Sequence, residues 1–327
     1  MKPALIAVIL ALLNGCMNMS AALPPPQSQY DAVIVNPVDG KAMTIDELAE
    51  RLMKTDVVVI GEYHGHHGSH LLQSRLQQAL HRQRPAQVLS MEQFDANHQK
   101  DLNRYLAGEM GESELIEDSE AWDNYRASYR PLVEYARLNQ QPVIAANAPA
   151  RVVRCVGRKG PDYLDQLSQE LQQFLPDEPF MDTASYREKF VDTMTGSHGT
   201  GTDAMSERMS NRYQAQLLRD NTMASRILEA TQTYPDHQIV HLTGTFHSEE
   251  RLGTVALLHK RAPGLSIAVI SPIFPDDEDL SKMIRENRHK GDILYVIQPL
   301  PVEFVDEERG REAMMERFRR SSSKPCD

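Results

Sequence analysis

Short, almost wholly apolar runs recur along this chain, and helical patterning separates the earlier ones. Each run is long enough for one strand and lacks the polar alternation of a strand with one face in water. Strands of this kind that alternate with helices form βαβ units, in which neighbouring strands are parallel. We therefore predict a three-layer α/β/α fold with a largely parallel central sheet. The runs are Asp56–Ile60, Gln87–Met91, Pro142–Ala146, Gln238–Thr243, Leu265–Ile270 and Asp292–Ile297.

The expected helices fall into two groups. Thr44–Leu52 begins with a Thr/Glu capping box, and Leu71–His81 and Tyr125–Leu138 have helical patterns between strands. From about residue 161 to 234 the alternation stops, and Tyr163–Phe174 and Ala204–Ala230 predict long polar helices. We interpret 161–234 as a helical insertion, which either lies over the active edge of the sheet or serves as a passive cover.

The charge balance excludes one class of function. The chain has 327 residues, with 35 Lys and Arg against 46 Asp and Glu, and a formal net charge of -11. A protein that binds nucleic acid through its phosphates needs an excess of positive charge, so we predict no nucleic-acid partner. The length suits one large domain, which we place at residues 30–305. We expect Tyr30–Val35 to be an edge strand and residues 306–327 to form a charged tail.

The first residues are typical of a targeting segment followed by a tether. Lys2 precedes an apolar run from Ala4 to Leu13, which predicts a signal peptide over residues 1–15. Leu13-Asn-Gly-Cys16 resembles a bacterial lipobox, in which the cysteine is acylated with chains such as palmitate. Met17 then favours the outer membrane, and residues 16–29 form a flexible tether. The alternative is a plain signal peptide with a chance cysteine.

Cys155 and Cys326 are the remaining cysteines. An oxidising compartment permits them to pair. Cys326 lies one residue from the C-terminus in a Ser-rich tail, where a free thiol is an equally good reading. The sequence leaves open whether the two are bonded.

Several predicted strands end in residues capable of chemistry. Glu62 and His64 follow the first apolar run, Glu92 follows the second, Asn147 the third and His247 the fourth. Because the carboxyl ends of parallel strands meet at one edge of a sheet, we expect these side chains to converge. Two carboxylates and two imidazoles can hold a divalent metal ion, with Glu62, His64 and His247 as ligands, or activate a water as a general base. Each residue alone is also compatible with a cap or a buried hydrogen bond.

Five short motifs follow one another along the chain: Gly61-Glu-Tyr-His64, Ser90-Met-Glu-Gln-Phe94, Ala146-Asn-Ala-Pro149, Arg219-Asp-Asn-Thr-Met-Ala224 and Gly244-Thr-Phe-His247. Together they resemble a known family, the ChaN-type haem-binding uptake lipoproteins. That family shares a superfamily with the erythromycin esterases and the Tiki metalloproteases, and the resemblance covers about residues 30 to 301. It implies an erythromycin esterase/ChaN-like fold.

Two functions follow from the resemblance. The ChaN branch implies an outer-membrane lipoprotein that binds haem reversibly in iron acquisition. Its expected partners are haem, outer-membrane lipid through the acyl anchor, a TonB-dependent haem receptor and a second copy in a homodimer. The other branches imply a metal-dependent or Glu/His hydrolase, in which Glu62, His64, Glu92 and His247 are catalytic.

Haem ligands are sought in the helical insertion. A porphyrin needs an apolar slot, an axial ligand such as His or tyrosinate, and basic groups for its propionates. Tyr186, His198 and Tyr213 are the candidate ligands, while Arg187, Arg208 and Arg212 are candidates for the propionates. The competing interpretation is that methionines at helical spacing mostly fill the core and that tyrosines are common on protein surfaces. Besides the three candidate ligands, the insertion offers a porphyrin Tyr163, Met181, Met194, Met205, Met209 and Met223.

Overall fold

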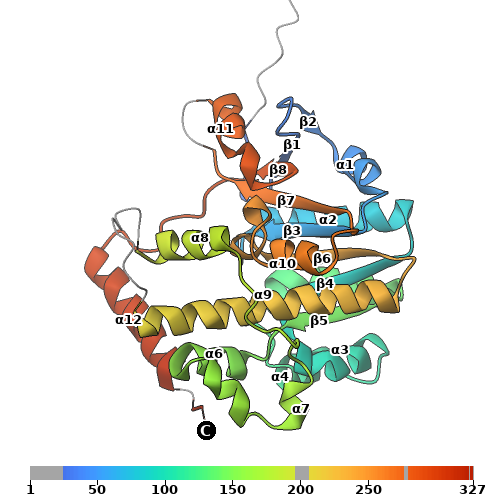
Figure 1. The fold of residues 1–327 in the computed structure, drawn as a ribbon. Helices are drawn as coiled ribbons and strands as arrows, with labels where there is room; N and C mark the ends of the chain where they lie inside the picture. The colour runs from blue at the N-terminus through green and yellow to red at the C-terminus, as the bar shows by residue number, and fades with distance from the viewer. Residues whose placement is uncertain (1–24, 196–205, 276–278, 324, 327) are drawn as a thin grey trace, which may run out of the picture.

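The structure is a computed structural model, and it describes residues 25–195, 206–275, 279–323 and 325–326. These residues form one eight-stranded sheet with the order β2-β1-β8-β7-β3-β6-β4-β5 (Figure 1). From β8 to β5 neighbouring strands are parallel, whereas β1 is antiparallel to both β2 and β8. The predicted largely parallel sheet is confirmed. The strands are β1 (Val33–Val35), β2 (Ala42–Met43), β3 (Val57–Glu62), β4 (Gln87–Asp95), β5 (Val143–Asn147), β6 (Gln238–Gly244), β7 (Ile267–Ile273) and β8 (Ile293–Val296).

Helices cover both faces of the sheet, as the three-layer prediction requires. Alternate residues of β3 enter different cores: Val58 and Ile60 pack with α1, α2 and α5, whereas Val57 and Val59 pack with α9 and α10. Both faces of β3 are therefore dry, which explains its unbroken apolar sequence. The helices are α1 (Ile45–Leu52), α2 (His67–Gln83), α3 (Gln99–Leu106), α4 (Glu112–Asp118), α5 (Arg130–Leu138), α6 (Ala150–Lys159), α7 (Gln169–Gln172), α8 (Ala184–Thr195), α9 (Glu207–Thr233), α10 (Thr254–Arg261), α11 (Leu280–Asn287) and α12 (Glu307–Ser323).

Local signals at the start of the domain are partly confirmed. The capping box of α1 forms, since the Glu47 backbone N–H donates to Thr44 Oγ1 at 3.2 Å and the Glu47 carboxylate accepts from the Thr44 N–H at 2.7 Å. The expectation of an edge strand at Tyr30–Val35 is wrong. After the turn at residues 37–40, Ala42–Met43 returns and pairs with β1, so β2 occupies the edge.

The segment between β5 and β6 is helical, as expected, but less regular than predicted. The long helix predicted over Tyr163–Phe174 is wrong: a short 3-10 helix, Pro161–Gln166, is followed by the one-turn α7. Leu167 between them has an extended backbone, which interrupts the helix. The second prediction is close, because α9 runs as one helix of 27 residues.

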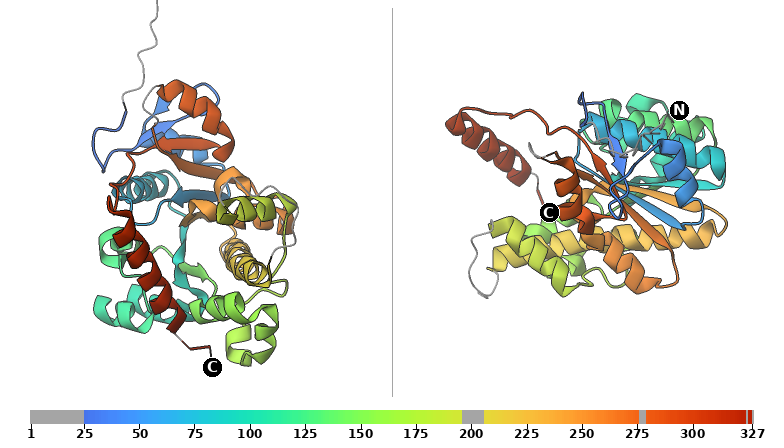
Figure 2. Two further views of the ribbon diagram at one scale, coloured as in Figure 1. Left: turned by 90° about the vertical axis from the view of Figure 1, so that its left-hand side faces the viewer. Right: turned by 90° about the horizontal axis from the view of Figure 1, so that it is seen from above.

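A disulfide joins the C-terminal end of the chain to the core. Cys155 in α6 is bonded to Cys326, across 171 residues of sequence. Within residues 306–327, expected as a charged tail, Glu307–Ser323 form α12, which stands apart from the three layers in the view from above (Figure 2). The disulfide therefore links the segment just after α12 to α6.

No helix within the described ranges is long and apolar enough to cross a membrane. The predicted signal peptide and Cys16 lie outside the described residues.

Candidate functional site

The carboxyl ends of β3, β4 and β6 bring four predicted residues to one edge of the sheet. Glu62 is the last residue of β3, Glu92 lies in the second half of β4, and His247 closes a 3-10 turn directly after β6. β3 pairs with β6 from Val57 to Glu62, and β6 pairs with β4. We call Glu62, His64, Glu92 and His247 the carboxylate–histidine rim.

Glu62 is a buried carboxylate surrounded by donors. It is 1% exposed, and it accepts hydrogen bonds from Tyr129 Oη at 2.6 Å, Gln73 Nε2 at 2.6 Å and Gln93 Nε2 at 3.2 Å. His64 Nδ1 lies 2.7 Å from its Oε1. Burial lowers the pKa of His64, but the hydrogen bond to Glu62 and the nearby charge of Glu92 outweigh it and raise the pKa overall.

Glu92 is held as an anion by different partners. Burial alone would raise its pKa, yet the imidazoles of His247 and His64 and hydrogen bonds from Thr243 and Gly244 lower the pKa to about 2. The Thr243 hydroxyl and the Gly244 N–H both donate to Oε2 at 2.7 Å. Glu92 is therefore a fixed negative charge near neutral pH rather than a proton donor.

His247 lies between two carboxylates. Its Nδ1 is 2.8 Å from Asp220 Oδ1 and its Nε2 is 3.5 Å from Glu92 Oε1. Burial lowers the pKa of His247, but the charges of Asp220 and Glu92 raise it overall. Asp220, in α9, is fully buried and also accepts from the hydroxyls of Tyr186 and Thr254.

Asp220 is the site residue that sequence reasoning missed. It belongs to Arg219-Asp-Asn-Thr-Met-Ala224, one of the motifs that carry the family resemblance. The sequence did contain one indication: Asp220 is an acidic residue on the side of a predicted helix that packs into the core. A buried carboxylate needs a partner, so such a residue is a candidate site residue.

Gly244 is where the two carboxylate networks meet. A Cβ built on Gly244 would lie 2.8 Å from His64 Nε2 and 3.8 Å from Glu92 Oε2. A Cβ here would collide with His64 as it is placed, so the close approach of the His64 ring to the backbone at Gly244 requires glycine. A group held between His64, Glu92 and His247 would meet two imidazoles and one anion, the components of general-base catalysis.

The predicted divalent metal site is not supported. Within the described ranges no group of three or more His, Cys, Asp or Glu side chains is arranged to hold a metal ion. The physical reason is that the predicted carboxylate ligand, Glu62, is already occupied as a hydrogen-bond acceptor by Tyr129, Gln73 and Gln93. The neighbouring His66 is structural, since its Nδ1 caps α2 by accepting from the Gly68 and Ser69 N–H groups.

The structure buries the two candidate haem tyrosines. Tyr186 is 1% exposed, and its hydroxyl donates to Asp220 Oδ2 at 2.6 Å. Tyr213 is fully buried, and its hydroxyl donates to Asp182. Burial, followed by the adjacent carboxylate, raises the pKa of each phenol, which opposes the tyrosinate form that binds iron. The third candidate, His198, lies outside the described residues.

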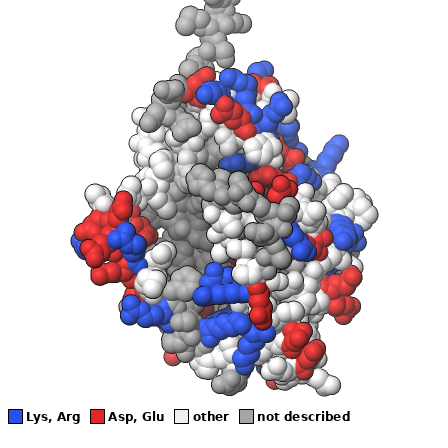
Figure 3. All heavy atoms as spheres, turned by 60° about the vertical axis from the view of Figure 1, so that its left-hand side comes forward, with Lys and Arg blue, Asp and Glu red and all other residues white. Residues whose placement is uncertain are grey.

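A second candidate site, which we call the arginine pocket, lies between α6 and α9. Its volume is about 1050 Å³, and Figure 3 shows basic side chains gathered beside a hollow on this side of the molecule. Arg208 and Arg212, predicted for propionates, line it, whereas Arg187 pairs with Asp182 instead. The lining residues are Ala150, Val153, Arg154, Gly157, Arg158, Met194, Glu207, Arg208, Asn211, Arg212, Ala215 and Arg219.

The arginine pocket and the rim share a wall. Arg219 lines the pocket, and the next residue, Asp220, bonds His247. The charge of Arg219 also acts against protonation of His247. A charge bound in the arginine pocket will therefore change the pKa of His247 in the rim.

The sequence matches one protein-family model. It is described as haem-binding uptake, Tiki superfamily, ChaN, and it covers residues 48–258, more than half of the chain. The match includes every rim residue, Asp220 and the arginine pocket. No curated protein matches at a significant level.

Solved structures with a similar fold include ChaN of Campylobacter jejuni, described as showing cofacial heme binding. It has a TM-score of 0.63 and 14% identity, over 84% of this chain and 100% of that one. A succinoglycan biosynthesis protein aligns with a TM-score of 0.47 and 14% identity, over 77% and 90% of the two chains. An erythromycin esterase mutant in its open conformation aligns with a TM-score of 0.44 and 13% identity, over 88% and 87%. The likeness to ChaN shows the fold that the two chains share.

Proposed function

This chain belongs to the family of haem-binding uptake proteins of the Tiki superfamily that includes ChaN, and on that premise we propose that it binds haem in the arginine pocket. The observation that carries the proposal is the pocket itself. It is the one place among those described above where apolar surface and several guanidinium groups face a cavity large enough for a porphyrin.

The chemistry of the lining suits a planar, apolar dianion. Val153 and Ala215 supply apolar contact for the ring, and guanidinium groups bind carboxylates such as propionates in a two-pronged geometry. Arg154 supports this most directly, because its Nε is buried with no hydrogen-bond partner within the described part of the chain. Burial, followed by the charge of Arg158, lowers the pKa of Arg154, so an anion would relieve repulsion there.

Iron ligation is proposed from the side of the pocket that α8 contributes. Met194 lines the pocket, and a thioether can ligate haem iron. His198 follows four residues later and remains a predicted ligand. When bound, the haem would supply the iron, while this chain would position it and exclude water from its faces.

A hemin titration of the whole protein, followed by the Soret band, tests the proposal. Arg154→Met should weaken hemin binding by about tenfold or more, the value of one charge-assisted hydrogen bond. Arg82→Met is the matched control, because Arg82 pairs with Asp46 on the exposed side of α2 and should bind hemin like the wild type. If Arg154→Met binds hemin as tightly as Arg82→Met does, the arginine pocket is not the binding site. If the wild type does not bind hemin, the protein is not a haem-binding protein.

We further propose that the protein is an outer-membrane lipoprotein acting in iron uptake, anchored through acylated Cys16. The lipobox-like Leu13-Asn-Gly-Cys16 and the tether that follows support this. A TonB-dependent haem receptor would be the natural partner, and the cofacial heme binding described for the Campylobacter protein motivates a homodimer. Cys16→Ser should abolish labelling with radioactive palmitate and release the protein from the membrane fraction. Labelled protein that persists in the variant would overturn the anchor.

A Glu/His hydrolase is the second candidate, favoured by the chain of contacts from Asp220 through His247 to Glu92. In that reaction His247 would act as the general base and take a proton from a water molecule near Gly244. Removal of such a base costs roughly 10²–10⁴ in rate. Hydrolysis of p-nitrophenyl acetate by the wild type, lost in His247→Gln, would support this candidate; equal rates in both proteins would contradict it.

A further inference from the structure

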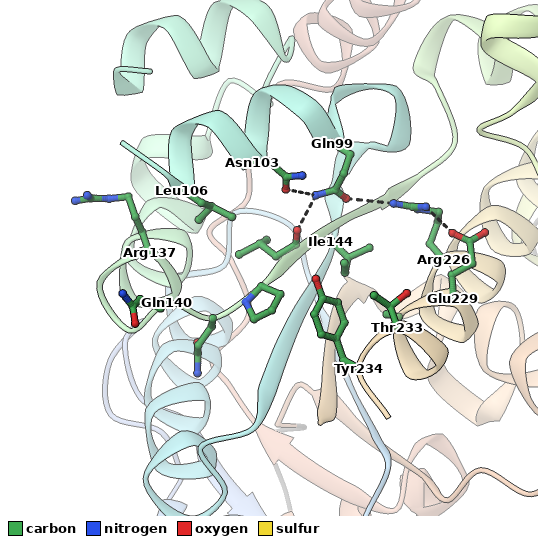
Figure 4. A pocket seen from close by; sticks show the side chains of 14 residues that line it. Gln99, Asn103, Leu106, Arg137, Gln140, Ile144, Arg226, Glu229, Thr233 and Tyr234 are labelled. Carbon is green, nitrogen blue, oxygen red and sulfur yellow. Dashed lines mark hydrogen bonds and ion pairs between the residues drawn. The ribbon is translucent and has the colours of Figure 1, made fainter. Parts of the chain in front are cut away.

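The outer edge of the sheet is bonded by a side chain instead of a strand. β5 is the last strand, and its free edge faces away from β4. Gln99, the first residue of α3, donates from Nε2 to the Val143 carbonyl at 2.8 Å and accepts at Oε1 from the Ala145 N–H at 2.8 Å (Figure 4). One carboxamide thus satisfies two backbone groups of the edge.

These two backbone groups define a strand position. They flank Ile144, and in a parallel sheet one residue of a neighbouring strand bonds the residues on either side of its opposite number. A carboxamide is also chemically a peptide group. Gln99 therefore makes the two hydrogen bonds that the N–H and C=O of one residue in a ninth, parallel strand would make opposite Ile144.

Arg226 of α9 completes the cover over this edge. Its Nε donates to the Ala145 carbonyl at 3.4 Å, and its terminal nitrogen donates to Gln99 Oε1 at 3.2 Å. Figure 4 shows Gln99 and Arg226 approaching from α3 and α9 across the strand. Both contacts come from a side chain rather than from the main chain of a helix.

A groove continues from Gln99 along the start of β5. It has a volume of about 530 Å³, and Leu106, Ile144 and Tyr234 give it apolar surface. Gln141 also lines it, is 5% exposed, and has an Nε2 donor without a partner in the described part of the chain. A buried amide donor without an acceptor is costly, and a peptide carbonyl is the acceptor it would match.

We propose that this groove binds an extended peptide segment, which adds to β5 as a ninth parallel strand after displacing Gln99. The peptide remakes the two hydrogen bonds to Val143 and Ala145 that Gln99 gives up, while the contact of Arg226 with Gln99 Oε1 is lost. Gln99 keeps a partner after it leaves, since its Nε2 already donates to Asn103 Oδ1 at 2.9 Å. The net free energy of binding then comes from burial of apolar surface and from main-chain hydrogen bonds beyond this one residue.

The groove also sets a preference for one side chain of the peptide. The residue opposite Ile144 shares its face of the sheet, where Ile144 and Tyr234 pack against the same apolar core. A β-branched aliphatic residue fits such a position best. The predicted ligand is an extended segment with Val or Ile at its centre.

The probe is the blocked pentapeptide acetyl-Ser-Thr-Val-Thr-Ser-amide, titrated into the full protein and followed by the amide NMR signals of Val143 and Ala145. Gln99→Ala should bind the peptide on the order of tenfold more tightly than the wild type, because the carboxamide that competes for the edge of β5 is gone. Adding Ala145→Pro to Gln99→Ala should abolish binding. That proline removes an N–H on the free edge, where strands tolerate it.

A second comparison keeps the test independent of how well the proline variant folds. In acetyl-Ser-Thr-Pro-Thr-Ser-amide the central N–H that would reach the Val143 carbonyl is missing, so this peptide should not bind Gln99→Ala. Equal binding of the two peptides would overturn strand addition. Absence of binding to both the wild type and Gln99→Ala would show that Gln99 only seals the edge against other chains.

Discussion

His247 Nδ1 and Asp220 Oδ1 lie 2.8 Å apart, although the two residues come from a turn after β6 and from the middle of α9. This pair couples the carboxylate–histidine rim to the helix that also lines the arginine pocket. Asp220 holds the ring while Glu92 faces its other nitrogen at 3.5 Å.

Asp220→Asn should lower the pKa of His247, because the largest attractive charge on a buried imidazole is removed. With a raised pKa, the stability that His247 contributes is fully present below its ordinary pKa and is lost as pH rises through the raised value. The variant should therefore lose about 1–3 kcal/mol below pH 6.5 and less above it. NMR titration of the His247 ring and urea unfolding at several pH values measure both effects. Tyr186→Phe is the control, since it removes a hydrogen bond to Asp220 and keeps the charge.

Glu92 should govern stability in acid. Its pKa is lowered to about 2, so its contribution is present above the ordinary value near 4.5 and is lost as pH falls from there toward 2. Protonation across this window removes on the order of 3 kcal/mol. Glu92→Gln should unfold with a flatter pH dependence between 4.5 and 2, measured by circular dichroism. An unchanged acid transition would show that Glu92 is not held as an anion by its neighbours.

Gly244→Ala should disturb the rim more than the fold. The new methyl would lie 2.8 Å from His64 Nε2, and His64 is partly exposed, so the ring can move outward. We expect the pKa of His64 to fall as it leaves Glu62 and Glu92, whereas His247 keeps its raised pKa. NMR titration of the two rings reads this directly. Parallel shifts of both rings would mean that the backbone, rather than His64, gives way.

Opening the Cys155–Cys326 bond should release α12. The bond closes a 171-residue loop, and the chain-entropy model assigns up to about 5 kcal/mol to such a loop. Cys326→Ser should therefore lower the free energy of urea unfolding and make the end of α12 sensitive to trypsin. A dithiol reductant should do the same to the wild type and nothing further to the variant. Resistance of reduced wild type to trypsin would show that packing, not the disulfide, holds α12.

Much of the sheet follows from local sequence. Each apolar run became a strand, and the capping box at Thr44 and Glu47 formed, because both features depend on residues close in the chain. The edge assignment of Tyr30–Val35 failed, because two residues at Ala42–Met43 were too few to recognise and yet sufficient to pair. The convergence of Glu62, Glu92 and His247 was also predictable, since parallel strands end at one edge.

The sequence by itself determined the strands of the parallel sheet, the family and the rim, because periodicity and short motifs are local properties. Only the tertiary structure decided which polar groups are already engaged. It showed that Tyr186 and Tyr213 spend their hydroxyls on Asp220 and Asp182, that Cys155 reaches Cys326, and that Gln99 covers the edge of β5. Each of these partners is distant in sequence, and no local pattern records which buried donor will meet which acceptor. The need of every buried polar group for a partner is met only when the layers pack.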